Sequence, residues 1–193
     1  MPTLDNVKKY QRKKFERYKE LNDIKTKNDE AYIVVAVKDR DSIFSEYSSS
    51  ERPILKIEFL DLIERRASFV PLELPLVLEI QNNNFTSEEK ILIRKLIKNH
   101  FSLKTVTKEV EYENGCRKGR FLFTTGVIGF SLLPFLGEFG KMAYIKEMIS
   151  VIASFSFWEY SGLKLFDHDE LKEEIIHYRH LSNIRVIYDK DNS

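Results

Sequence analysis

Hydrophobic and polar positions follow two different rhythms along this chain. Apolar residues run almost without interruption over 31–37 and 76–80, and polar Asn, Asp or Gln residues bound both runs, which predicts two buried β-strands. Between 54 and 68, between 86 and 120, and again from Leu171, apolar residues recur every three or four positions. That spacing predicts helices that each bury one face.

Local signals set the limits of these elements. Thr86 and Glu89 stand at capping-box spacing, which predicts the start of a long helix. We expect this helix to continue to Arg120, with Asn114-Gly115 as its weak point. A last strand is expected at 184–188, paired with one of the two earlier strands. The segments before and after the middle of the chain would then form one small α/β domain.

The middle of the chain departs from this pattern. Residues 121–137 include no charged side chain, and seventeen helical residues would span about 26 Å, near the lower limit for crossing a bilayer. A second apolar segment, 142–163, has only eleven uncharged residues at its centre, so we expect the two to insert together as a transmembrane helical hairpin. The residues predicted to span the membrane are Phe121, Leu122, Phe123, Val127, Ile128, Leu132, Leu133, Ile149, Ile152 and Phe155.

Small residues favour close packing within this hairpin. Ser150 and Ser154, with Ala153 beside them, would allow close approach to a helix that bears Gly126 and Gly129. Two alternatives remain open: a soluble protein that buries the two apolar helices in its core, and a peripheral amphipathic hairpin.

Charge gives the expected orientation. The basic flank at 117–120 places residues 1–120 and 164–193 in the cytoplasm, and the protein in the inner membrane. The segment 1–27 has nine Lys or Arg against four Asp or Glu, and we expect a basic helix there, either solvated or lying against anionic lipid headgroups.

The predicted fold class is α+β, a small cytoplasmic α/β domain interrupted by a two-helix transmembrane hairpin. The four regions are a basic N-terminal helix at 1–27, an α/β region at 28–120, the hairpin at 121–163, and a helix with a closing strand at 164–193.

Glu159 is the main functional candidate, and the adjacent Trp158 is the second. An acidic residue near a membrane span is expected to carry a proton or cation, or to pair with a base. The Ser156 hydroxyl lies one turn away and could form a hydrogen bond with the Glu159 carboxylate. In the alternative interpretation, Glu159 is an ordinary interfacial residue beside Trp158, which suits the aromatic belt of a membrane interface.

Other functional signals are weak. Glu174 and His177 form a single Glu-x-x-His, with His180 three residues on, which predicts a solvated helix face rather than a metal site. No catalytic residue, metal site or cofactor is predicted, because phosphate loops, zinc motifs and nucleophile elbows do not occur in the sequence. A net charge of +1 argues against a dedicated nucleic-acid binder, and the lone Cys116 cannot form an internal disulfide.

The order of these motifs resembles a family of uncharacterised bacterial proteins with two predicted transmembrane helices, over residues 30–190. The resemblance rests on Pro75–Ile80, Asn99-His100-Phe101, Trp158-Glu159, Leu165-Phe166-Asp167, the helix from Leu171, and the strand at Leu181–Ile187. Members often carry a second acid four positions after the Trp, where this chain has Gly162, which weakens any shared proton-handling role. The resemblance implies the architecture only.

Three functions fit these features. The first is a membrane-anchored, non-enzymatic interaction or assembly module, with the lipid bilayer and itself or another membrane protein as partners. The second is an oligomeric conduit or transporter accessory built from several hairpins. The third is a soluble α/β protein that binds a ligand through a buried apolar hairpin.

Overall fold

The structure of this chain is a computed structural model. It describes residues 15–16, 18–19, 24–49, 53–81, 85–136 and 141–188. The chain divides into two compact units, the first formed by Met1–Thr105 and Ile176–Ser193, and the second by Val106–Ile175. The basic helix expected at 1–27 lies largely outside the described residues.

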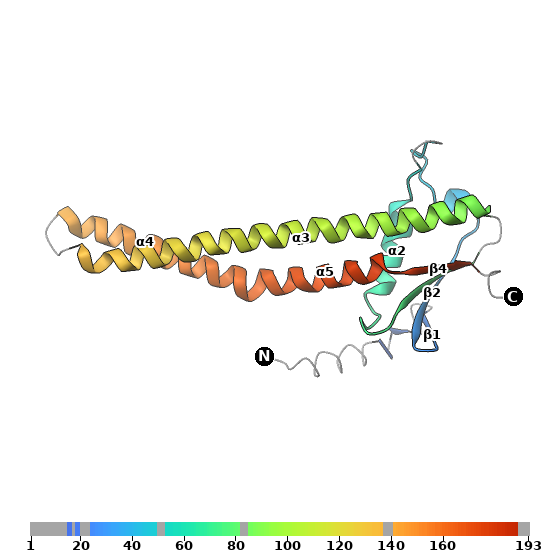
Figure 1. Cartoon of the computed structure of the whole chain (residues 1–193), viewed down its shortest axis with the longest axis horizontal. Coiled ribbons are helices and arrows are strands. Elements are labelled where there is room, and N and C mark those ends of the chain that lie inside the picture. Colours follow the sequence, from blue (N-terminus) through green and yellow to red (C-terminus); the bar gives the residue numbers. More distant parts are fainter. Residues whose placement is uncertain are drawn as a thin grey trace. The chain divides into compact units, whose positions relative to one another are not determined.

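The first unit contains a four-stranded sheet (Figure 1). Its strands, in spatial order, are β1 (Ile24–Lys27), β2 (Glu30–Ala36), β3 (Leu76–Gln81) and β4 (Arg185–Tyr188). β1 and β2 are antiparallel, while β2, β3 and β4 are parallel. Asn28 and Asp29 have φ values of 51° and 58°, the left-handed backbone that a two-residue hairpin turn requires. The three predicted strands are confirmed, and β4 pairs with β3.

One face of this sheet forms the core of the first unit. Alternate residues of the strands are buried there, including Ile33, Leu78 and Tyr188, each with no exposed surface. The helices that pack on this face are α2 (Ile57–Ala67) and parts of α3 (Ser87–Leu132) and α5 (His168–Ser182). The apolar positions of α2 are spaced for one face and supply Phe59 and Ile63 to the core, as the sequence predicts.

Helix α3 begins at the predicted capping box. The Thr86 amide donates to the Glu89 carboxylate at 3.0 Å, and the Glu89 amide donates to the Thr86 hydroxyl at 3.2 Å. The helix then continues for 46 residues, without interruption at Asn114-Gly115. It therefore passes beyond Arg120, where the predicted membrane span was expected to begin.

The prediction of a transmembrane hairpin at 121–163 is wrong. No helix within the described residues combines the length and the apolar character needed to cross a bilayer. The uncharged run at 121–137 is not one helix, because α3 ends at Leu132 and a 3₁₀ turn containing Pro134 follows. Helix α4 (Lys141–Gly162) carries Lys146, Glu147 and Glu159. The inner-membrane location inferred from that hairpin is overturned by the same finding.

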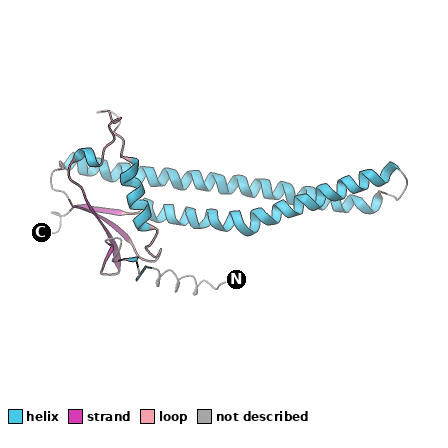
Figure 2. Cartoon of the chain, turned by 180° about the vertical axis from the view of Figure 1, so that it is seen from behind, coloured by secondary structure: helices cyan, strands magenta, loops and turns pink. Residues whose placement is uncertain are grey.

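The second unit is a helix pair within 106–175, formed by α4 and the distal part of α3 (Figure 2). Contacts at Gly119 with Tyr160, at Gly126 with Phe157 and at Gly129 with Ala153 run in opposite directions along the two helices, so the pair is antiparallel. The two glycines do lie at the close approach, but they meet Ala153 and Phe157 rather than the two serines of the prediction, and Ser154 is exposed. A π-helical turn, Leu163–Asp167, joins α4 to α5.

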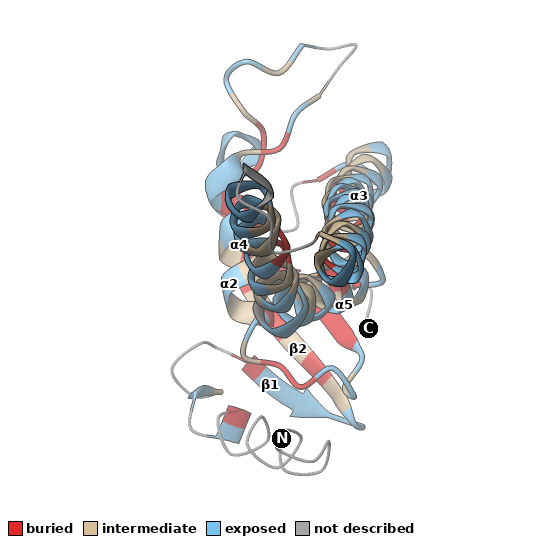
Figure 3. Cartoon of the chain, turned by 90° about the vertical axis from the view of Figure 1, so that its left-hand side faces the viewer, coloured by how far each residue is buried: buried red, intermediate tan, exposed pale blue. Residues whose placement is uncertain are grey.

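The fold is therefore mostly helical, with one small sheet. The α/β part that the sequence predicts is present. The segment 121–163, which the sequence interpretation places in lipid, instead belongs to the paired helices α3 and α4. The outer surfaces of these two helices are largely exposed (Figure 3).

Candidate functional site

Helix α4 has two apolar sides that face in different directions. Its inner side faces α3, where Ala153 is completely buried and the Phe157 ring packs against Phe123 and Phe130 with centroid distances of 5.7 and 5.5 Å. Its other side carries large apolar residues that remain exposed. We call this set the outer stripe: Tyr144, Met148, Val151, Phe155 and Trp158, flanked by Ile145 and Ile152.

The outer stripe follows the spacing of a coiled-coil seam. Its five main residues are separated by four, three, four and three positions, which keeps them in line on one side of the helix. Trp158 is 78% exposed, Tyr144 76% and Met148 64%. Apolar sides of a helix are normally covered, and among the described residues α3 covers one apolar side of α4 while the outer stripe stays exposed.

A shallow hollow of about 400 Å³ interrupts the outer stripe. It is lined by Tyr144, Glu147, Met148, Val151 and Ile152, and its walls are mainly apolar. Four of these residues stand at positions i, i+3, i+4 and i+7, the arrangement that forms the hole for a side chain of a facing helix in knobs-into-holes packing.

The distal part of α3 adds further exposed apolar surface to the second unit. The residues that contribute are Phe121, Phe123, Val127, Ile128, Phe130 and Leu132. The predicted membrane-span residues are thus mostly exposed, while Leu122, Leu133 and Ile149 are half-buried. Monomeric proteins rarely expose contiguous apolar patches of more than a few hundred Å², so this surface is the strongest functional signal in the structure.

Glu159, the predicted chemical candidate, is held in an ion pair. The Lys118 ammonium lies 2.8 Å from its carboxylate, and both side chains are partly exposed. The Ser156 hydroxyl donates instead to the Ile152 carbonyl at 2.8 Å. Of the roles considered for Glu159, pairing with a base is the one that the structure shows.

Cys116 and His168 form a contact that the sequence analysis missed. The thiol sulfur lies 3.6 Å from the imidazole Nε2, and the His168 ring packs on Tyr112 with centroids 5.1 Å apart. A Cβ at Gly115 would lie 3.5 Å from Nε2, which is an ordinary van der Waals distance, so the contact does not depend on the glycine. The two residues are 52 positions apart, and His168 follows the π-helical turn directly, so no local sequence signal could bring them together.

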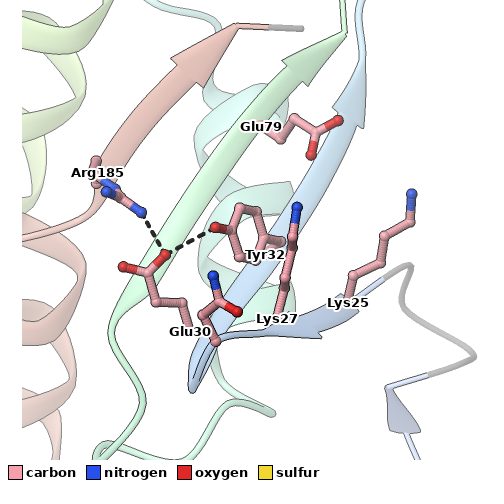
Figure 4. A pocket seen from close by; sticks show the side chains of 7 residues that line it. Lys25, Lys27, Glu30, Tyr32, Glu79 and Arg185 are labelled. Atoms are coloured by element: carbon pink, nitrogen blue, oxygen red, sulfur yellow. Dashed lines mark hydrogen bonds and ion pairs between the residues drawn. The ribbon is translucent and has the colours of Figure 1, made fainter. Parts of the chain in front are cut away.

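The open face of the sheet holds a second, polar hollow of about 610 Å³ (Figure 4). Glu30 accepts hydrogen bonds there from Tyr32, at 2.9 Å, and from Arg185, and this carboxylate raises the pKa of the Tyr32 hydroxyl. Lys25 and Lys27 are exposed at the rim. The Glu30 carboxylate is therefore already paired with Arg185, and this ion pair joins β2 to β4.

A partly buried network links the three helices of the first unit. Glu64 of α2 accepts hydrogen bonds from Lys104 of α3 at 2.6 Å and from Tyr178 of α5 at 2.8 Å. Burial raises the pKa of Glu64, but these two hydrogen bonds outweigh it and the net pKa is lowered. The network therefore holds these three helices together.

The prediction that His180 lies on a solvated face is wrong. Its Nε2 bonds to the Leu74 carbonyl at 2.9 Å, and burial lowers the pKa of the imidazole. Glu174 pairs with Lys108 at 2.9 Å. No cluster of three metal-ligating side chains occurs among the described residues.

Sequence reasoning found part of the outer stripe and missed the rest. The sequence prediction includes Ile152 and Phe155 as membrane-span residues and Trp158 as a functional candidate at the membrane interface. Tyr144, Met148 and Val151 complete the stripe, and the four-three spacing through all five positions is the signal that would have identified it.

Comparison with known proteins adds no identity. No protein-family model, no curated protein and no solved structure matches this chain.

Proposed function

We propose that this chain is an interaction protein, and that the outer stripe of α4 is its binding surface for another helix. The observation that carries the proposal is the four-three spacing of five exposed apolar residues on a helix whose opposite side is already packed. Such a surface gains free energy only when another apolar surface covers it.

The shape of the stripe favours a helix over a small ligand. Ligand pockets usually enclose most of the bound molecule and offer a few convergent polar groups. The hollow at Tyr144, Met148 and Val151 is lined by α4 alone, and Glu147 is its one charged residue. It is suited to receive one side chain from a helix that continues along the stripe on both sides.

Photo-crosslinking in living cells tests this proposal. A benzophenone amino acid placed at Phe155 is expected to form adducts with a protein, and the crosslinked peptide should map to a helix of that protein. Ile91 is the matched control, because it is as exposed as Met148, at 64%, but lies in the first turns of α3 within the first unit.

A second substitution makes this experiment specific. Met148→Glu, introduced beside the probe, should abolish the adduct by placing a charge in the contact. Adducts that form equally from Ile91, that survive Met148→Glu, or that contain only lipid would refute the proposal.

A further inference from the structure

We propose that the helix bound by the outer stripe is α4 of a second copy of this chain, so that the protein forms a two-fold symmetric dimer. This inference rests on the proposed function and names the partner. A two-fold dimer needs a surface that is complementary to itself, because both copies present the same patch.

The outer stripe supplies both halves of such a contact. The hollow at Tyr144, Met148 and Val151 is a hole for a side chain, and Phe155 and Trp158 project as knobs, with 65% and 78% of their surfaces exposed. Both features lie in line on one helix. When a second α4 lies along the first, the Phe155 and Trp158 side chains of one copy can fill the hollow of the other copy. No other kind of partner is needed.

The size of the stripe meets the requirement of a stable dimer. Its seven residues are between 47% and 78% exposed. At the roughly 200 Å² of a large aromatic side chain for each residue, the stripe exposes at most about 900 Å² per copy, which is comparable with the ~800 Å² per partner of a standard interface. The exposed apolar residues of α3, such as Ile128 and Phe130, are available in addition.

The charges around the stripe allow two copies to meet. The eleven residues from Met148 to Trp158 include no charged side chain, so the centre of the contact would bury none. At one end Lys146 and Glu147 stand next to each other, and at the other end Glu159 is already paired with Lys118. Like charges that would keep two identical surfaces apart are therefore absent from the middle of the seam.

The oligomeric state of the purified full-length chain tests the inference. Light scattering or sedimentation over about 1–100 µM, a range typical of such interfaces, should give twice the 22.8 kDa chain mass for the wild type. The Met148→Glu/Phe155→Glu variant should be a monomer, with dimerisation weakened at least ~100-fold, because each copy would place two carboxylates in an apolar contact. Ile91→Glu, with the same type of change at a site of equal exposure, should remain a dimer.

Three results would overturn the inference. One is a wild-type chain that remains a monomer at the highest concentration. If the Phe155 probe still forms an adduct with a helix of a different protein, only the choice of partner is wrong and the proposed function stands. Another is a dimer that Met148→Glu/Phe155→Glu leaves intact, since the contact then lies elsewhere. The third is a monomer that sediments with phosphatidylglycerol-containing vesicles through the same residues, which would overturn the proposed function as well.

Folding of the variants is checked by circular dichroism at 222 nm. If the double glutamate variant loses helix, Met148→Ser/Phe155→Ser gives the same test with smaller side chains, and it should also shift the population toward monomer.

Discussion

Gly129 and Gly162 lie in the same helix pair, but replacing each of them by alanine is expected to change the stability in opposite directions. A Cβ at Gly129 would lie 2.8 Å from the Ala153 Cβ and 3.6 Å from its Cα, whereas a Cβ at Gly162 would meet nothing within 4 Å. Gly162 has ordinary helical backbone angles, with φ −59° and ψ −53°. Alanine should therefore be tolerated at Gly162 and resisted at Gly129.

The magnitudes follow from two opposing terms. Replacing glycine by alanine within a helix stabilises by about 1 kcal/mol. At Gly129 the added methyl group lies almost 1 Å closer to Ala153 than carbon atoms prefer, and Ala153 is fixed by its backbone, so overpacking costs about 1–3 kcal/mol. We expect Gly129→Ala to destabilise by about 1 kcal/mol net and Gly162→Ala to stabilise by up to ~1 kcal/mol.

Thermal unfolding followed at 222 nm measures both effects. For a chain of this size 1 kcal/mol corresponds to about 2–4 °C, so the two variants should move Tm in opposite directions. All samples need the same protein concentration, because self-association makes Tm depend on it. Adding Ala153→Gly to Gly129→Ala removes the colliding methyl group, and the double-mutant cycle should show favourable coupling of about 1 kcal/mol. A Gly129→Ala variant that gains stability as Gly162→Ala does would refute the reasoning.

Three further predictions concern charged and titratable groups. Glu64→Gln should lower the free energy of unfolding by about 1–2 kcal/mol in urea titrations, because it weakens a partly buried, charge-assisted hydrogen bond from Tyr178 and the ion pair beside it; an unchanged midpoint would contradict this. Acidification from pH 7.5 to 5.5 should destabilise the wild type, because the pKa of His180 is lowered in the fold and the unfolded state takes up the proton first, starting near its ordinary value of about 6.5. His180→Gln, which keeps a donor for the Leu74 carbonyl, should make stability less dependent on pH in this range, and an equally steep loss would show that other groups cause it. Glu159→Gln should change stability by less than about 0.5 kcal/mol, since its ion pair is largely exposed; a loss of several °C in Tm would assign this residue a larger role.

The elements of the first unit could be predicted because their signals are local. The buried runs at β2 and β3, the spacing in α2 and the Thr86–Glu89 capping box all depend on neighbours a few positions away. β1 was missed, since its sequence Ile-Lys-Thr-Lys buries a single residue and is a strand only because β2 lies beside it. For β4, the sequence could only narrow the pairing partner to β2 or β3, and the structure shows that it is β3.

The second unit was misread because composition alone does not show where a helix ends. The uncharged run at 121–137 suggests one span, yet Pro134 lies just beyond the last residue of α3 and divides the run. An apolar segment is also compatible with lipid, with a buried core and with a contact between proteins. Gly126 and Gly129 identify the inner side of the helix pair, whereas the outer side is identified by the four-three spacing together with its exposure.

The position of β4 has a consequence for how this chain acquires its structure. β3 ends at Gln81 and its parallel neighbour β4 begins at Arg185, so more than a hundred residues must be synthesised before that ladder can form. Until then the Val77–Ile80 edge of β3 has unpaired backbone groups beside strongly apolar side chains. Contacts between residues so distant in sequence form slowly. During translation, the emerging chain is therefore expected to depend on chaperones that shield this edge until the final strand arrives.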